Sequence, residues 1–130
     1  SWTKFFVAHA WSGIHSLRLF FSRPTQIKPK VISVGNFQMG GSGKTPFVLE
    51  LLREAESLKK KVWVLTRGYR SNSESRGGVI VSDSVNVSAN VFGDEAIVIH
   101  RAYPEVPIGV GVNRLASYEK LRWELGYEPD

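Results

Sequence analysis

The chain has 130 residues, of which 42% are hydrophobic and 22% charged, as expected for one globular domain with its own core. It contains no cysteine, which excludes disulfide bonds, cysteine metal ligands and thiol nucleophiles. The net charge of +5 lies at one end, because residues 1–30 hold five of the 17 basic residues and none of the 12 acidic ones. Residues 31–130 hold 12 basic and 12 acidic residues and carry no net charge. This balance argues against a nucleic-acid-binding surface on the body of the domain.

The basic N-terminal segment is predicted to be an amphipathic helix over residues 2–23. On a helical wheel one arc collects Trp2, Phe6, Val7, Ala10, Gly13, Ile14, Leu17, Phe20 and Phe21. Polar residues interrupt the segment too often for a membrane span, so two interpretations stay open: binding to a membrane interface, or packing on the protein's own core. We expect residues 1–28 to form this membrane-associating helix and a linker, and residues 29–130 to form the main domain.

After residue 30, predicted strands and helices alternate along the chain. This alternation predicts an α/β fold with a parallel sheet flanked by helices. Apolar runs predict strands at Val31–Val34, Val62–Thr66, Val79–Val81 and Val106–Val112. Helical periodicity predicts helices at Thr45–Leu58, from Gly93 to about Ala102, and from Asn113 to about Leu125. Residues 71–78 and 82–90 are predicted as polar loops. A further strand is expected near Glu128–Asp130, and we expect the chain to be truncated within its fold.

A glycine-rich loop, Gly40 to Thr45, lies between the first predicted strand and the first helix of the main domain. In this setting backbone N–H groups cradle phosphates, and glycines allow close approach of the backbone. Lys44 would then reach the β- and γ-phosphates, and the Thr45 hydroxyl would hold Mg²⁺. Gln38 stands where the strict motif has its first glycine, so the alternative is a glycine-rich turn with a chance Gly-Lys-Thr.

Acidic and basic residues at predicted element ends are the other candidates for chemistry. Asp94 and Glu95 begin a helix, where one carboxylate could meet Mg²⁺ and the other accept a hydroxyl proton. The alternative is that these two carboxylates do no more than compensate the dipole of the helix. Arg67 and Arg114 both follow strands and so could point into a ligand edge or be surface arginines. Asp83 is a weaker candidate for a metal-binding carboxylate.

Several segments together resemble the tetraacyldisaccharide 4'-kinase (lipid A 4'-kinase) family. They are Val34-Gly35-Asn36, Gly40 to Pro46, Thr66-Arg67-Gly68-Tyr69, Gly93-Asp94-Glu95 and Val110-Gly111-Val112-Asn113-Arg114. The family also lacks the first loop glycine. The resemblance implies a P-loop NTPase-like fold and transfer of the γ-phosphate of ATP, with Mg²⁺, to the 4'-hydroxyl of tetraacyldisaccharide 1-phosphate in lipid A biosynthesis. It implies ATP binding by Gln38, Met39, Gly40, Gly41, Ser42, Gly43, Lys44 and Thr45.

The resemblance also implies roles for residues outside the loop. Asp94 would be the base for the sugar hydroxyl, Lys44 and Arg114 would assist phosphate or substrate, and Thr45 and Glu95 would hold the metal. The protein would act peripherally at the cytoplasmic face of the bacterial inner membrane. The family's acidic strand, Gln-His segment and second domain are not in this sequence, so we expect the chain to be inactive alone. Alternatives are a GTPase, a metal-chaperone ATPase or a membrane-surface nucleotide switch.

Overall fold

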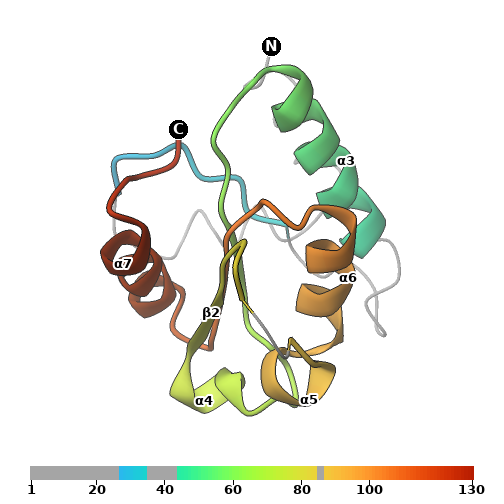
Figure 1. Cartoon of the computed structure of the whole chain (residues 1–130), viewed down its shortest axis with the longest axis vertical. Coiled ribbons are helices and arrows are strands. Elements are labelled where there is room, and N and C mark those ends of the chain that lie inside the picture. The colour runs from blue at the N-terminus through green and yellow to red at the C-terminus, as the bar shows by residue number, and fades with distance from the viewer. Residues whose placement is uncertain (1–26, 35–43, 85–86) are drawn as a thin grey trace, which may run out of the picture.

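The structure, a computed structural model, describes residues 27–34, 44–84 and 87–130 (Figure 1). The predicted amphipathic helix over residues 2–23 lies outside the described residues, and so do Gln38 to Gly43 of the glycine-rich loop. Within the described part, no helix combines the length and apolar character needed to cross a membrane.

A three-stranded sheet lies at the centre of the molecule, with strands β1 (Val64–Thr66), β2 (Gly78–Ile80) and β3 (Ile108–Val110) in the order β1-β3-β2. Strands β1 and β3 are parallel, with Leu65 opposite Gly109, whereas β2 and β3 are antiparallel, with Val79 opposite Gly109. The predicted parallel sheet is therefore mixed. The connection from β1 to β2, residues 67–77, is shorter than the dozen or more residues that a parallel crossover takes.

One predicted strand is absent from the sheet. Residues 31–34 were expected to form a buried parallel strand, but they have no strand assignment and Val31 is 59% exposed. The physical reason is their position across a cavity from β1, where no described strand offers them hydrogen-bond partners. The prediction of a strand at residues 31–34 is therefore wrong for the described residues.

The helices are α3 (Lys44–Ser57), α4 (Ser73–Arg76), α5 (Ala89–Phe92), α6 (Asp94–Ala102) and α7 (Arg114–Leu125). The three longer ones confirm the predicted helices to within a residue or so. Helix α7 begins where Asn113 Oδ1 accepts a hydrogen bond from the Ala116 N–H at 3.0 Å, and it ends at Gly126 with φ +74°. The short helices α4 and α5 lie in segments that were predicted as loops.

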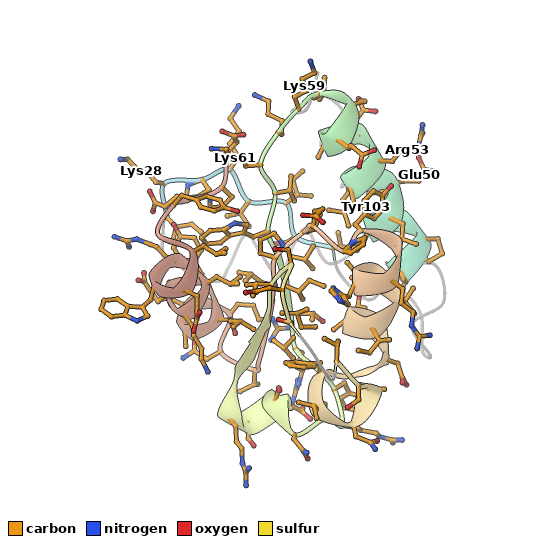
Figure 2. The ribbon with its side chains drawn as sticks, in the orientation of Figure 1. Lys28, Glu50, Arg53, Lys59, Lys61 and Tyr103 are labelled. Atoms are coloured by element: carbon orange, nitrogen blue, oxygen red, sulfur yellow. The ribbon has the colours of Figure 1, made fainter. Side chains whose placement is uncertain are left out.

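The helices cover both faces of the sheet, α7 on one side and α3 with α6 on the other (Figure 1). Side chains fill the space between these layers (Figure 2). The core cluster consists of Leu52, Ile80, Ala96, Ile99, Ile108 and Val110. Gly109 lets α7 approach closely, because a Cβ there would lie 3.0 Å from Ser117 Cβ and 3.1 Å from Leu121 Cδ1. These contacts fix the carboxyl ends of β1 and β3 against the two helices that carry the candidate site.

Candidate functional site

The carboxyl ends of β1 and β3 bring the candidate residues to one edge of the sheet. Because the two strands are parallel, Thr66 and Arg67 at the end of β1 lie near the turn that leads from β3 to Arg114. Thr66, Arg67, Glu95 and Arg114 line the same cavity. Ligands of open α/β sheets bind outside the carboxyl ends of the strands, so this edge is the candidate site.

Glu95 is held in place by the end of β1. The buried Thr66 hydroxyl donates a hydrogen bond to Glu95 Oε2 at 3.0 Å, across 29 residues of sequence. The backbone supports this contact, since Gly68 and Gly93 have φ +72° and +95° and a Cβ on Gly93 would lie 3.2 Å from Gly68 Cα. The turn after β1 thus packs directly on the start of α6, which glycine alone allows without strain.

Asp94 and Glu95 have different surroundings although they are adjacent. Glu95 is half-buried against the strand, whereas Asp94, the first residue of α6, is exposed. Both carboxylates lie in the first turn of the helix, where the dipole favours negative charge. The Glu95 carboxylate is therefore fixed by the protein and lines the cavity, whereas Asp94 is exposed and is not among the lining residues.

Two arginines give the site positive charge. Burial, followed by repulsion from Arg67, lowers the pKa of Arg114, while the Glu95 carboxylate acts in the opposite direction. Arg114 Nη1 donates to the Val112 carbonyl at 2.9 Å, and Arg114 forms no ion pair with a described carboxylate. Arg67 Nε, in contrast, pairs with Glu74 at 2.8 Å. Of the two described arginines at this edge, Arg114 is consequently the one whose charge is available to an anionic ligand.

Glu74 fixes the turn that carries Arg67. Its carboxylate accepts hydrogen bonds from Arg67 Nε at 2.8 Å and from the Arg70 backbone N–H at 2.9 Å. The hydrogen bond from Arg67 and then that from Arg70 lower the pKa of Glu74. The turn also contains Arg70 with φ +60°, a conformation that non-glycine residues adopt infrequently. Side-chain contacts therefore hold this turn in a fixed shape beside the site.

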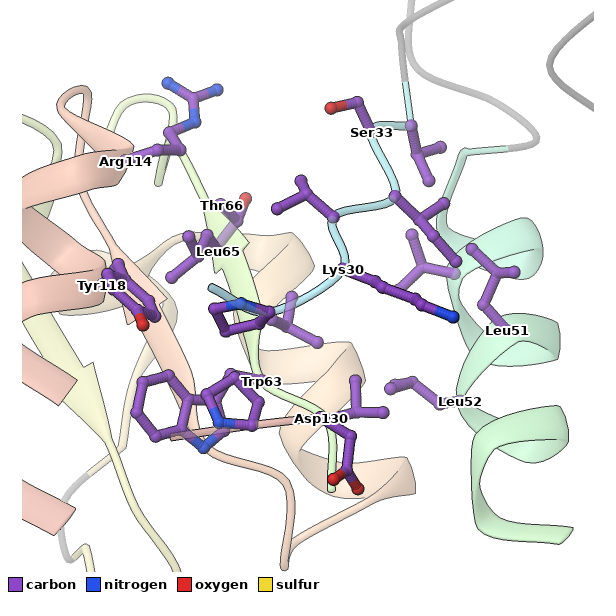
Figure 3. A pocket seen from close by; sticks show the side chains of 18 of the residues that line it. Lys30, Ser33, Leu51, Leu52, Trp63, Leu65, Thr66, Arg114, Tyr118 and Asp130 are labelled. Carbon is purple, nitrogen blue, oxygen red and sulfur yellow. The ribbon is translucent and has the colours of Figure 1, made fainter. Parts of the chain in front are cut away.

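The cavity has a volume of about 510 Å³ and extends well beyond the polar cluster. Figure 3 shows Ser33, Thr66 and Arg114 at one end, Trp63 and Asp130 at the other, and Leu51 and Leu52 on the α3 wall. Most of the lining between the ends is aliphatic or aromatic. A charged edge thus adjoins a largely apolar space.

The remaining candidate residues do not all lie at this edge of the sheet. Lys44 and Thr45 open α3, and Thr45 is half-buried. Asp83 follows β2, whose antiparallel direction carries it away from the carboxyl ends of β1 and β3, so it does not join the site. Across the described residues, no group of three His, Asp or Glu side chains is placed to hold a metal ion. Sequence reasoning included Thr66 in the Thr66-Arg67-Gly68-Tyr69 segment but gave it no role in the site, which its hydrogen bond to Glu95 now supplies.

The fold is that of an α/β protein whose candidate site combines carboxylates and arginines at the carboxyl ends of two parallel strands. Residues 5–128 match the model of the LpxK family, described as tetraacyldisaccharide-1-P 4'-kinase. The chain belongs to this family.

Curated relatives carry the same description. A tetraacyldisaccharide 4'-kinase of Leptospira biflexa is 39% identical over 110 residues, which cover 78% of this chain and 29% of the relative. One of Polynucleobacter asymbioticus is 34% identical over 93% of this chain and 32% of the relative, and one of Chlamydia pneumoniae is 38% identical over 84% and 30%. The chain therefore spans about a third of the length of these relatives. No solved structure matches it.

Proposed function

We propose that the chain is the ATP-binding part of a lipid kinase that transfers the γ-phosphate of ATP to the 4'-hydroxyl of tetraacyldisaccharide 1-phosphate, a step of lipid A biosynthesis. Family membership supports this proposal. The observation that carries it in the structure is the placement of Glu95, which Thr66 fixes and whose charge acts on Arg114, with the exposed Asp94 next to it in the chain. A phosphate-transfer site needs such carboxylates and cations together.

ATP would bind to the glycine-rich loop, residues 38–45, which leads into α3. This loop and the alternation of strands and helices support a P-loop NTPase-like domain over residues 29–130. Lys44 would neutralise charge on the β- and γ-phosphates, and backbone N–H groups at the start of α3 would hold the phosphates in place. Arg114 would stabilise the charge that develops on the transferred group.

Asp94 would accept the proton of the attacking sugar hydroxyl, because its carboxylate is exposed and lies next to the fixed Glu95. Thr45 and Glu95 would hold Mg²⁺, since hydroxyl and carboxylate oxygens are the ligands that this hard cation prefers. The ion would supply neutralisation of phosphate charge. In this arrangement Glu95 acts as a fixed oxygen ligand, and Asp94 is the group that exchanges a proton with the substrate.

The lipid substrate and the N-terminal segment together support a peripheral location at the cytoplasmic face of the bacterial inner membrane. Residues 2–23 combine an aromatic and aliphatic arc with basic residues and no acidic ones. Such a segment binds the interface of an anionic membrane through both apolar burial and charge. Residues 1–28 would then be a membrane-associating unit that keeps the kinase domain near its lipid substrate.

The test is a chimaera in which this chain replaces the matching segment of the Leptospira biflexa relative. Incubated with ATP labelled at the γ-phosphate and tetraacyldisaccharide 1-phosphate, the chimaera should transfer label to the lipid. Lys44→Ala and Asp94→Asn should each lower the rate by about 10²-fold or more. Lys120→Ala on α7 and Asp83→Asn beyond β2 are matched controls and should leave the rate unchanged. A chimaera that binds ATP but never labels the lipid would contradict the proposal.

A further inference from the structure

We propose that Glu74 of α4 is a positioning residue of the candidate site. It ties the turn after β1 to the turn after β3 and so holds the Arg114 guanidinium where it can meet a phosphate group. The role rests on the proposed function, since Arg114 would there stabilise the charge of the transferred phosphate. Glu74 is not among the residues that line the cavity, so it would act through its neighbours and not by touching a ligand.

The side chain of Glu74 holds the turn after β1 at two points. Glu74 Oε1 accepts a hydrogen bond from Arg67 Nε at 2.8 Å, and Oε2 accepts one from the Arg70 backbone N–H at 2.9 Å. The carboxylate therefore fixes both the path of the turn and the direction in which the Arg67 side chain leaves it. Because Arg70 has φ +60°, which is costly for a residue with a side chain, the turn needs a contact of this kind to keep its shape.

The backbone of Glu74 holds the turn after β3. Its carbonyl accepts a hydrogen bond from the Val112 N–H at 2.8 Å. Close packing supports this contact, because a Cβ on Gly111 would lie 3.4 Å from Gly77 Cα and 3.6 Å from the Ser73 carbonyl oxygen. Helix α4 thus lies against the turn that leads from β3 to α7, at the end of the sheet where β2 begins (Figure 1).

Val112 carries the constraint on to Arg114. Its N–H donates to Glu74, and its carbonyl accepts a hydrogen bond from Arg114 Nη1 at 2.9 Å. A chain of hydrogen bonds therefore runs from the turn after β1, through Glu74 and Val112, to the guanidinium. A guanidinium has N–H donors on three nitrogens, so the bond from one of them to Val112 leaves others for a phosphate oxygen.

The charge of Glu74 has a second effect on Arg114. Burial, and then repulsion from Arg67, lower the pKa of Arg114, so the two guanidinium groups are close enough to repel each other. The Glu74 carboxylate pairs with Arg67 and offsets its positive charge. Without this carboxylate, Arg67 would be free to turn, and its full charge would push Arg114 out of position. Loss of Glu74 should therefore disturb Arg114 through both geometry and charge.

The first test measures kcat and KM for ATP in the chimaera with the Leptospira biflexa relative. Glu74→Ala should lower kcat by about 10-fold and change KM for ATP by less than about 2-fold, because Arg114 would act on charge that develops in the transition state. Glu74→Gln keeps one acceptor oxygen and should lower kcat by only about 3-fold. The matched control is Glu50→Ala, which breaks an exposed ion pair with Arg53 at the same 2.8 Å and should leave kcat unchanged.

A double-mutant cycle shows whether Glu74 acts through Arg114. In the Arg114→Ala background, Glu74→Ala should lower kcat by less than about 2-fold further. A full 10-fold loss that persists in that background would overturn the proposal, since Glu74 would then act independently of Arg114. An unchanged kcat in Glu74→Ala would overturn it as well. So would a lower KM for ATP at unchanged kcat, because it would mean that Glu74 acts only as a negative charge near an anionic substrate.

Amide hydrogen exchange in the same chimaera tests the chain of hydrogen bonds without phosphate transfer. Glu74→Ala should speed exchange of the Arg70 and Val112 N–H groups by about 10-fold. The internal reference is the Gly111 N–H, which donates to the Thr66 carbonyl at 2.9 Å and should be unaffected. If Glu74→Ala does not fold, Glu74→Gln takes its place in both measurements.

The two measurements separate this proposal from the proposed function. Faster exchange at Arg70 alone would refute the tie between the two turns, whatever the kinase activity. Faster exchange at both Arg70 and Val112 in a chimaera that binds ATP but never labels the lipid would support the tie and contradict the kinase.

Discussion

The two sides of β1 differ in how closely they are packed. Toward β3 the sheet is paired and covered by α7, and Ile108 and Val110 have no exposed surface. Toward residues 31–34 the same strand faces a cavity of about 510 Å³. We call these the closed side and the open side. The candidate site lies at the boundary, because Thr66 belongs to β1 while Glu95 and Arg114 come from the helices that follow.

The closed side is held by many packing contacts and hydrogen bonds between described residues. On the open side, the described residues make few contacts across the cavity. Gly109 lets β3 lie close to both Leu65 of β1 and the Ser117 and Leu121 side chains of α7. On the open side, the described connections between the two walls pass through Asp130. Substitutions on the two sides should therefore have unequal effects on the free energy of unfolding.

The largest expected effect compares Ile108→Ala with Ile32→Ala. Ile108 is fully buried in β3, so its truncation should lower the free energy of unfolding by about 3–4 kcal/mol through lost burial and a cavity. Ile32 already lines a cavity, and the same truncation there should cost less than about 1 kcal/mol. Urea unfolding of both variants measures the difference. Equal losses would show that the open side is packed as tightly as the closed side.

A smaller effect is expected where the turn after β1 meets α6. Gly93→Ala places a Cβ 3.2 Å from Gly68 Cα at φ +95°, and we expect a loss of about 2–3 kcal/mol. Gly126→Ala is the matched control, because φ is +74° there but no atom lies within 4 Å of the added Cβ; its loss should be about 1 kcal/mol. Thermal unfolding separates the two. If Gly93→Ala cost no more than Gly126→Ala, the close backbone contact would not be needed.

The smallest effect is a pH dependence at Tyr118, a buried residue of α7 that lines the cavity. Burial, then the hydrogen bond at 2.6 Å to Glu128, raise the pKa of Tyr118 to about 12 from an ordinary value of 10.0. A raised pKa in the folded state means that the unfolded chain loses its proton first, so stability from this group is complete below pH 10 and declines between about pH 10 and 12.

The measurement for Tyr118 is urea unfolding at a series of pH values across that window. Tyr118→Phe removes the titrating hydroxyl but keeps the ring that packs on Trp63 at 5.6 Å between centroids. The decline in stability should be less steep in Tyr118→Phe, by up to about one proton in the linkage slope. Identical slopes in the two proteins would contradict the raised pKa.

Sequence periodicity was sufficient for the longer helices. Helix α7 was predictable because Asn113 and Gly126 mark its ends and apolar residues repeat between them. The pairing of β2 was not predictable from its own residues, because antiparallel pairing depends on the length of the connection from β1. Helices α4 and α5 have four residues each, too few for a helical repeat to show.

The contacts of the candidate site were not predictable from the sequence. Glu95 was a candidate because it belongs to an acidic pair at a predicted helix start, and Arg114 because it follows a predicted strand. The hydrogen bond from Thr66 to Glu95 joins residues 29 apart, and only the folded backbone brings them together. The strand expected at residues 31–34 failed for a related reason. An apolar run specifies burial, but a strand also needs a neighbour with free peptide groups.

The short antiparallel strand β2 has a consequence for how this sheet avoids aggregation. An edge strand with exposed peptide groups is a template on which other chains can assemble. β2 closes the outer edge with three residues, of which Gly78 leaves no room for a side chain, and the neighbouring α4 contributes the Glu74 carbonyl that accepts from the Val112 N–H at 2.8 Å. The opposite edge, at β1, is sheltered between α3 and residues 30–34. The sheet can thus lengthen only inward, where a foreign strand would have to enter between two walls.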